Sequence, residues 1–313
     1  MVPSAVTLAA PVLCLALVVD RLIGDPHSRY HPVALLGSFI GVWGKPGYYP
    51  HNLQRAAGVL FWALTILLFC IPFILVTTFA PWYLYLLLAP FLLKCCFAWR
   101  SLEEHAEAVV SALKEGVENG REKVSMLVSR DTAKLDRDHI LSAGYESMTE
   151  NLTDSIIAPL FWFSLFSLPG AAVCRAINTM DAMLGYRDER ERLGWCAARM
   201  DDIANFIPAR ITVLLLLIWF AGRGRYSRAR QVMRRDGHLR PGFNGGIVMA
   251  AMAGGTGIRF EKTGVYAIGE GERTLDEGGA DILKAARAVT VMYAIIACCT
   301  LFLLGTLINN IGI

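Results

Sequence analysis

Charged residues are scarce in this chain. Asp, Glu, Lys and Arg make up only 18% of its 313 residues, whereas hydrophobic residues make up 55% and the mean hydropathy is +0.44. Soluble domains carry about 25% charged residues, so this composition excludes an ordinary soluble protein. It predicts a polytopic membrane protein whose first partner is lipid.

The signatures of nucleic-acid binding, zinc sites and P-loops are also missing. The net charge is only +3, and Lys and Arg form no basic tail with interleaved aromatic residues, so no nucleic-acid partner is expected. The eight cysteines form no Cys-x-x-Cys pair, which leaves no sign of a disulfide framework or a zinc site. No Gly-x-x-x-x-Gly-Lys-Ser/Thr motif occurs. No internal repeat is evident either, which counts against transporters built from repeated halves.

Long uncharged runs predict four firm transmembrane helices. The first run ends at Asp20 and lacks the basic region of a signal peptide, so it is expected to remain as a span. Residues 56–93 contain 38 uncharged residues, or about 57 Å of helix, roughly twice the hydrocarbon core of a bilayer. This run therefore predicts a helical hairpin that turns at Pro81. The predicted spans are residues 1–19, 56–79, 82–99 and 288–308.

Two further segments are ambiguous. Residues 155–174 are uncharged but contain two prolines, and residues 203–222 have Arg210 in their middle. Each is either a further span or a re-entrant helix that lines a cavity. We favour the re-entrant alternative, because parity then places all the long polar segments on one face of the membrane.

The positive-inside rule makes this face cytoplasmic. The sequence thus predicts a single membrane-embedded all-α domain over residues 1–313, in the inner (cytoplasmic) membrane of the cell. Its polar segments, residues 100–154 and 223–287, would carry their motifs on the cytoplasmic side.

Three carboxylates recur every four residues on a helix predicted from Arg137 through Asp154. Glu146, Glu150 and Asp154 share one face of this helix, and like charges at this spacing repel each other. Either the face is fully solvated, or a cation such as Mg²⁺ or an arginine cluster lies against it.

Further carboxylate, amide and guanidinium groups gather beside the ambiguous segments. Asn178 and Asp181 lie one helical turn apart, and Gly185 is expected to end their helix in the left-handed conformation. Simple ion pairs would explain each group alone, but ionisable groups at membrane depth are costly unless they have a function. The other polar groups beside the ambiguous segments are Arg187, Arg199, Asp201, Asp202, Asn205 and Arg210. For His31, which closely follows the first run, we expect a structural hydrogen bond rather than a ligand role.

The order of these motifs resembles that of the CobD/CbiB family, the adenosylcobinamide-phosphate synthases of cobalamin biosynthesis. The motifs are GDP and HPV after the first span, RDT, ESMTENLTDSIIAPLFW, RAINTMDAMLGYRDER, ARMDDIANFIPARIT, a Pro-x-x-Asn loop, AAMAG and a late Tyr-x-x-Gly-Glu. The resemblance covers nearly the whole chain. It implies a membrane enzyme that uses ATP to join the corrinoid adenosylcobyric acid to (R)-1-amino-2-propanol O-phosphate, or a related amino alcohol, through an amide bond.

This chemistry suggests roles for the polar residues. We expect Mg²⁺ to use ligands from Asp154, Asp181, Asp201 and Asp202, with Glu150 also in this pool. ATP or amino-alcohol phosphates are expected at Arg130, Arg187, Arg210, Asn178 and Asn244. Catalytic roles fall to Glu146 as the base, Glu150 and Arg199. A homo-oligomer and contacts with later pathway enzymes stay open, and the rival functions are a membrane transporter and a regulator without synthase activity.

Overall fold

The computed structural model describes residues 7–25 and 30–311. The chain divides into two compact units, and a single membrane-embedded domain over residues 1–313 stays a prediction. The first unit comprises Met1–Ala98, Asp154–Asn205 and Ala294–Ile313, and the second comprises Trp99–Thr153 and Phe206–Tyr293.

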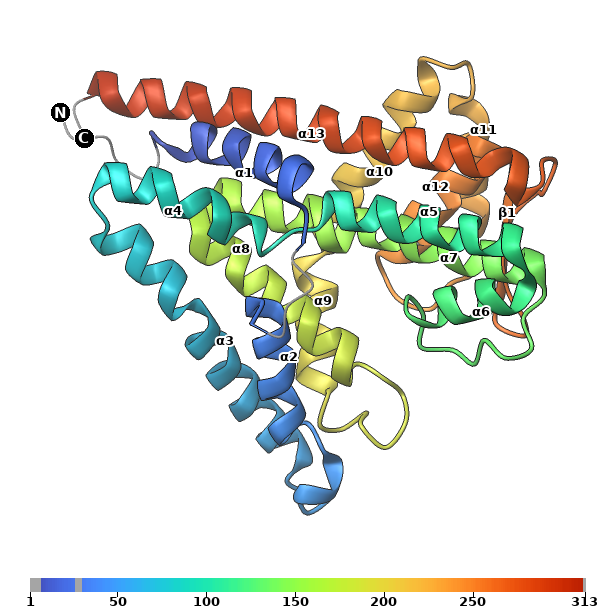
Figure 1. The fold of residues 1–313 in the computed structure, drawn as a ribbon, viewed down its shortest axis with the longest axis horizontal. Helices are drawn as coiled ribbons and strands as arrows, with labels where there is room; N and C mark the ends of the chain where they lie inside the picture. The colour runs from blue at the N-terminus through green and yellow to red at the C-terminus, as the bar shows by residue number, and fades with distance from the viewer. Residues whose placement is uncertain (1–6, 26–29, 312–313) are drawn as a thin grey trace. The chain divides into compact units, whose positions relative to one another are not determined.

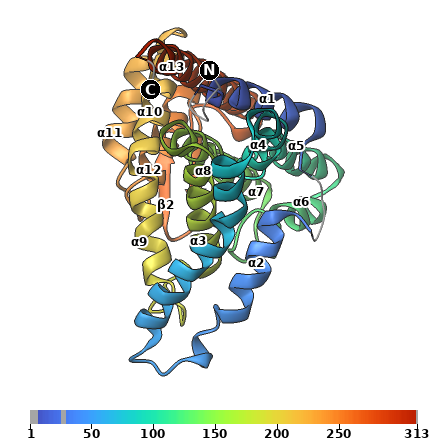
Figure 2. The ribbon, with the colours of Figure 1, turned by 90° about the vertical axis from the view of Figure 1, so that its left-hand side faces the viewer.

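Helices make up nearly all of the secondary structure (Figures 1 and 2). Those that lie mainly in the first unit are α1 (Ala9–Ile23), α2 (Pro32–Trp43), the 3-10 turn η1 (Pro46–Tyr48), α3 (Gln54–Phe79), α4 (Trp82–Lys94), the π-helical turn η2 (Thr153–Ile157), α8 (Ala158–Leu184) and α9 (Trp195–Ala204). The second unit contains α5 (Trp99–Glu115), α6 (Val117–Ser125), α7 (Arg137–Leu152), α10 (Phe206–Ala221), α11 (Tyr226–Asp236), α12 (Gly245–Thr256), β1 (Arg259–Lys262) and β2 (Tyr266–Gly269). The last helix, α13 (Leu275–Ile311), begins in the second unit and ends in the first.

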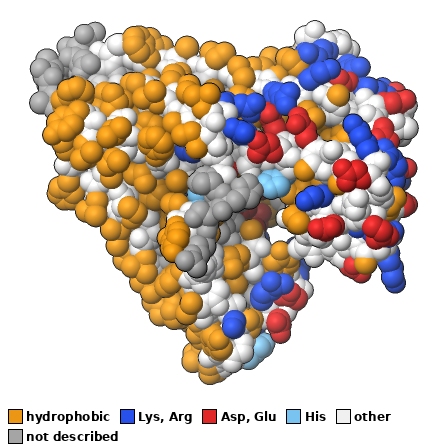
Figure 3. Space-filling view, in the orientation of Figure 1, with side chains coloured by type: hydrophobic (Ala, Val, Ile, Leu, Met, Phe, Trp, Pro, Cys, Tyr) orange, Lys and Arg blue, Asp and Glu red, His pale blue; other side chains and the backbone are white. Residues whose placement is uncertain are grey.

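Among the described residues, four helical stretches are long and apolar enough to cross a membrane, or five if the bent pair α9 and α10 counts as one span. The four stretches cover Gln54–Phe79, Trp82–Glu115, Arg137–Leu184 and Leu275–Ile308. In α3 only 17% of the most apolar window is buried within the protein, so most of its surface suits lipid. Hydrophobic side chains cover much of the visible surface over α3 and α4 in Figure 3. The predicted class, an all-α polytopic membrane protein, is thereby confirmed.

The described part of the first predicted span is shorter than a bilayer core requires. Helix α1 has 15 residues, or about 22 Å, and residues 1–6 of that prediction lie outside the described residues. Whether residues 1–19 cross the membrane stays a prediction.

Both ambiguous segments contain a break. Within α8 the backbone leaves the helical region at Phe166 and Ser167, where Ser167 has a φ of 58°. Pro169 follows two residues after Ser167 and cannot donate the amide hydrogen bond that a regular helix needs. In the other segment, α9 and α10 meet at a 42° bend, which is typical of a broken span or a re-entrant loop. The re-entrant alternative for these two segments stays a prediction.

The core of the first unit lies among α2, α3, α8 and α9. Trp43 stacks on Phe61 with ring centroids 5.5 Å apart, and both belong to a hydrophobic cluster that includes Met180 of α8. Gly58 permits a close approach here, because a Cβ atom at this position would lie 2.1 Å from the carbonyl oxygen of Leu193.

The second unit is built around α12, a helix of small residues that is buried on nearly all sides. The glycines of this helix allow its neighbours to pack tightly against it. A Cβ atom on Gly255 would lie 2.2 Å from the Phe220 ring of α10. The strands β1 and β2 form an antiparallel hairpin that pairs Lys262 with Tyr266, and Gly264 takes a φ of 72° in its turn.

Candidate functional site: two polar clusters

The first unit contains an acidic cluster on α8, α9 and the π-helical turn. We define it as Asp154, Asn178, Asp181, Asp201, Asp202 and Asn205. The centre of the cluster is Asp201, whose Oδ1 accepts a hydrogen bond from Asn205 Nδ2 at 3.0 Å. Asn178 also donates to Asp201, and the carboxylates of Asp181 and Asp202 lie close enough to repel its charge.

A change of helix type brings Asp154 into this cluster. The π-helical turn follows directly after α7, and Asp154 is its second residue. Such turns alter the register of side chains along a helix and frequently occur at functional sites. Asp154 and Asp201 each lie within electrostatic range of the buried thiol of Cys174.

One amide atom gives this cluster the character of a cation site. Asn205 is only 1% exposed, and its Oδ1 has no hydrogen-bond partner in the described part of the chain. A buried amide oxygen without a donor suits a hard cation, and Mg²⁺ prefers carboxylate and amide oxygens. Among the described residues, no three Asp, Glu, His or Cys side chains are grouped closely enough to hold a metal ion. Magnesium would therefore bind through one or two carboxylates, the Asn205 oxygen and oxygens from a substrate, so the donor set fits this ion.

The two arginines predicted near this cluster are accessible. Arg199 lies 3.8 Å from Asp202, and its side chain is 58% exposed. Arg187 is exposed in the loop between α8 and α9.

The end of α8 differs from the prediction. Gly185 caps this helix with a φ of −73° and not in the left-handed conformation. A Cβ atom there would lie 2.0 Å from Asp181 Oδ1 and 2.8 Å from the Asp181 carbonyl oxygen, so glycine avoids both close contacts.

The second unit contains a mixed cluster of carboxylates and arginines. Its buried centre is Glu146, which is 4% exposed and accepts hydrogen bonds from three side chains. Ser142 Oγ donates at 2.5 Å, Tyr266 Oη at 2.7 Å and Arg130 Nη2 at 3.2 Å. Burial, together with the adjacent Glu146 carboxylate, raises the pKa of Tyr266, so this phenol stays a hydrogen-bond donor.

A second branch of the mixed cluster leads to the start of α12. Arg240 Nε lies 2.8 Å from Glu150 Oε1. The same guanidinium covers Gly245, where a Cβ atom would lie 2.6 Å from Arg240 Nη1. The preceding residue, Asn244, stands at the N-cap position of α12, and its Oδ1 accepts a hydrogen bond from Arg210 Nη1 at 2.6 Å.

This branch has the chemistry of an anion site. Arg210 also donates to the Phe243 carbonyl at 3.2 Å and lies over the Phe206 ring, so its guanidinium is held in a defined position. The first amides of a helix point away from the helix and favour negative charge. Two oriented guanidinium groups at such an end can contact a phosphate bidentately. We define the mixed cluster as Arg130, Ser142, Glu146, Glu150, Arg210, Arg240, Asn244 and Tyr266.

The predicted carboxylate stripe is thus divided between the units. Glu146 and Glu150 lie on the regular helix α7, and each contacts an arginine, which is one of the two predicted alternatives. Asp154 lies beyond the change to π-helix and belongs to the first unit.

Sequence reasoning missed three members of the mixed cluster: Ser142, Arg240 and Tyr266. Arg240 directly precedes the Pro-x-x-Asn motif and Tyr266 begins the Tyr-x-x-Gly-Glu motif, but neither motif indicates a carboxylate partner about 90 to 120 positions away. His31 has its expected role, because its Nδ1 accepts a hydrogen bond from the Val33 amide at 3.3 Å and caps α2.

The fold and the two clusters define a helical membrane protein with buried polar sites. The family model described as "CobD/Cbib protein" matches residues 13–293. The chain therefore belongs to the CobD/CbiB family of cobalamin biosynthesis proteins.

Three relatives are similar over most of their length. Proteins named "Probable cobalamin biosynthesis protein CobD" are 38% identical in Methanothermobacter thermautotrophicus, 42% in Pyrococcus abyssi and 43% in Thermococcus kodakarensis. The alignments cover 91%, 90% and 80% of this chain and 96%, 93% and 82% of the relatives, respectively. No solved structure matches the chain.

Proposed function

We propose that the protein is an ATP-dependent amide ligase of the cytoplasmic membrane, with its polar clusters facing the cytoplasm. It joins the carboxylate of adenosylcobyric acid to the amine of (R)-1-amino-2-propanol O-phosphate, or of a related amino alcohol, and forms adenosylcobinamide phosphate. The γ-phosphoryl group of ATP passes to the carboxylate and gives an acyl phosphate and ADP. The amine then attacks the acyl carbon, loses a proton and releases phosphate.

The observation that carries this proposal is the content of the two clusters. Phosphoryl transfer depends on positioning and on charge stabilisation more than on covalent help from the protein. It needs oxygen ligands for Mg²⁺ and guanidinium groups for phosphates. The acidic cluster offers the first through Asp201 and the Asn205 oxygen, and the mixed cluster offers the second through Arg210 and Arg240.

Mg²⁺ would be held by Asp201 and Asn205, with Asp154, Asp181 or Asp202 as further ligands, and would supply neutralising charge for phosphate oxygens. Arg210, fixed by Asn244 at the start of α12, binds a phosphate of ATP or of the amino alcohol. Arg187 and Arg199 are accessible for a second phosphate.

The two glutamates of α7 take different tasks. The oxygens of Glu146 are engaged by Arg130, Ser142 and Tyr266, so this residue positions Arg130. The Glu150 side chain is 26% exposed, compared with 6% for Glu146, and Glu150 is therefore the better acceptor for the proton of the attacking ammonium. This assignment replaces Glu146 as the proposed base.

The test is ligation by the full-length protein purified in detergent. Adenosylcobyric acid, aminopropanol phosphate and Mg-ATP should together give the amide, detected by mass spectrometry, with release of one phosphate per product. Asp202→Asn should abolish product, whereas Asp188→Asn, which alters an exposed carboxylate of the same unit, should not. If the folded protein forms no amide with either phosphorylated or free amino alcohol, the proposal is wrong.

A further inference from the structure

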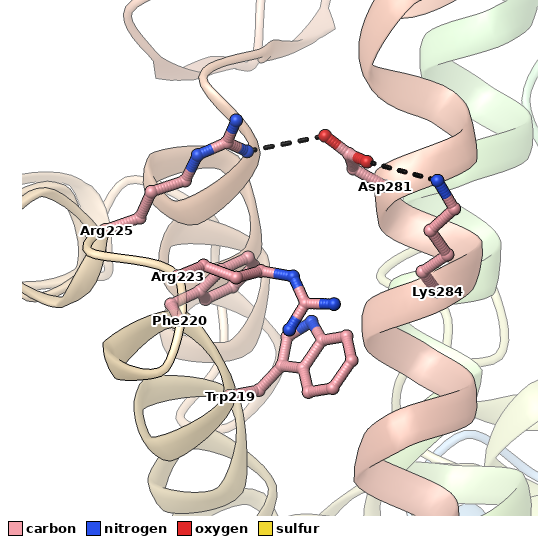
Figure 4. Close-up of a pocket in the computed structure, with 6 residues that line it drawn as sticks. All are labelled: Trp219, Phe220, Arg223, Arg225, Asp281 and Lys284. Atoms are coloured by element: carbon pink, nitrogen blue, oxygen red, sulfur yellow. Dashed lines mark hydrogen bonds and ion pairs between the residues drawn. The ribbon is translucent and has the colours of Figure 1, made fainter.

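A basic pocket of about 240 Å³ lies in the second unit, outside both clusters (Figure 4). Its lining residues are Trp219, Phe220, Arg223, Arg225, Asp281 and Lys284. The first four come from the end of α10 and the turn after it, and the last two come from α13. The volume is several times the roughly 30 Å³ that one water molecule occupies, so a head group fits.

Positive charge exceeds negative charge in this pocket. Its single carboxylate, Asp281, lies 3.3 Å from Arg225 and 3.8 Å from Lys284. Arg273, which does not line the pocket, also pairs with this carboxylate, with Nη1 2.7 Å from Asp281 Oδ2. Asp281 is therefore shared among three cations, and the Lys284 side chain is still 63% exposed.

Arg223 is the cation best placed to meet a ligand. Its guanidinium carbon lies 3.3 Å from the centroid of the Trp219 ring, and Figure 4 shows it over the indole, turned toward the space between α10 and α13. No carboxylate lies within 4.0 Å of it in the described part of the chain. Stacking on Trp219 fixes the plane of the guanidinium and leaves its N–H groups available for an anion.

The sequences of both helices indicate where this pocket lies relative to the bilayer. In α10 the uncharged run 211–222 ends directly before Arg223, and Trp219 lies one turn inside it. In α13 Lys284 precedes the uncharged run 288–313 by one turn. Tryptophan and basic residues at the end of an apolar run are typical of the level of the lipid head groups.

We propose that this pocket binds the phosphate head group of an anionic membrane lipid. Arg223 and Lys284 contact the phosphate oxygens. Arg225 pairs with Asp281 and forms the polar wall of the pocket. The Trp219 and Phe220 rings contact the adjoining glycerol and acyl carbons. Basic pockets between membrane helices are known to select anionic lipids in this way. The same phosphate chemistry is present in soluble phosphates, but the position beside two apolar runs favours a lipid.

Native mass spectrometry of the full-length protein in mild detergent tests this inference. Phosphatidylglycerol should bind as one retained molecule per chain, about ten-fold more tightly than phosphatidylcholine. The double variant Arg223→Gln/Lys284→Gln should lose this preference. The control Arg230→Gln/Arg234→Gln removes two exposed arginines from α11 and should retain it.

A second measurement locates the lipid. Brominated phosphatidylglycerol should quench tryptophan fluorescence less in Trp219→Phe than in the wild type. Equal binding of the two lipids, or unchanged binding by Arg223→Gln/Lys284→Gln, would overturn the proposal. Displacement of the lipid by millimolar inorganic phosphate or ATP would also overturn it and would assign the pocket to a soluble phosphate.

Discussion

The phenol of Tyr266 donates a hydrogen bond of 2.7 Å to the buried carboxylate of Glu146, which is 120 positions earlier in the chain. The β-hairpin makes this contact possible, because Tyr266 begins its second strand. Asp236 holds the other end of that strand through the amide of Gly269 at 2.9 Å. The hairpin thus fixes the side chain that completes the hydrogen bonding of Glu146.

Tyr266→Phe should lower kcat/KM for ligation by about ten-fold or more, because a hydrogen bond to a charged group is worth about 1.5–3 kcal/mol. If Glu146 only positions Arg130, most of the loss should be in KM for a phosphorylated substrate. Steady-state kinetics of this variant, compared with Tyr226→Phe on the exposed side of α11, provide the check. A fall in kcat alone would contradict the positioning role.

Asp201→Asn should weaken the binding of divalent cations by about ten-fold or more, because it removes the central carboxylate of the acidic cluster. Mn²⁺ can serve as the probe, with its binding followed by electron paramagnetic resonance in the detergent-solubilised protein. Asn205→Ala should weaken it in the same direction through loss of the buried amide oxygen. Asp188→Asn is the matched control, and equal Mn²⁺ affinity in all four proteins would remove the metal site from the acidic cluster.

Arg210→Lys should raise KM for ATP or for the amino-alcohol phosphate by about ten-fold, which is the cost of about one charged hydrogen bond. A lysine cannot contact both the Asn244 side chain and the Phe243 carbonyl while presenting a planar fork to phosphate. Arg230→Lys, on the exposed face of α11, should leave both KM values unchanged. Unaltered KM values in Arg210→Lys would give this arginine a purely structural role.

Gly58→Ala should destabilise the protein by about 1–3 kcal/mol, because the new methyl group meets the Leu193 carbonyl oxygen. Thermal unfolding in detergent measures the change. Gly41→Ala, also in a helix of the first unit, has nothing within 4 Å of the added Cβ atom and should be neutral or slightly stabilising. Equal melting temperatures for the two variants would mean that α3 can shift to accept the methyl group.

Low pH should reduce the stability of the second unit, because Asp236 becomes protonated. The hydrogen bond from Arg235, with a second from the Gly269 amide, holds the pKa of Asp236 below its usual value. Its contribution to stability is therefore complete above about pH 4, the unfolded value, and is lost as the pH falls through the lower folded value. Asp236→Asn should be less stable than the wild type at pH 7, and the difference should narrow below pH 4. A constant difference from pH 7 to pH 3 would exclude this linkage.

The sequence predicts the helices well because their apolar runs are long. Helices α3, α4 and α13 follow from uncharged stretches whose length matches or exceeds a bilayer core. The chemistry that the family resemblance implies also places Arg210 and Asn244 among the expected phosphate contacts and Asp201 among the expected Mg²⁺ ligands, but it does not assign Asn205 as a ligand. Polar groups beside apolar segments are costly unless they have a function, so their position alone indicates a functional site.

Other features depend on contacts that no local pattern encodes. Helix α12 has the glycine content of a loop, and only its burial against neighbours such as Phe220 makes that composition helical. The π-helical turn has no simple sequence signature, so the predicted stripe extends wrongly to Asp154. The Arg240 and Tyr266 contacts require long-range folding of the chain, which spacing along the sequence cannot show.

The low burial of α3 has a consequence for the choice of membrane. Its 26 residues are about 39 Å long, whereas a typical hydrocarbon core is about 30 Å thick. A helix longer than the core tilts, bends or thickens the bilayer around it, and each response has a modest cost for every ångström of mismatch. Because only 17% of the most apolar window of α3 is buried within the protein, most of that window is left for lipid, and thicker membranes should accept the protein more easily.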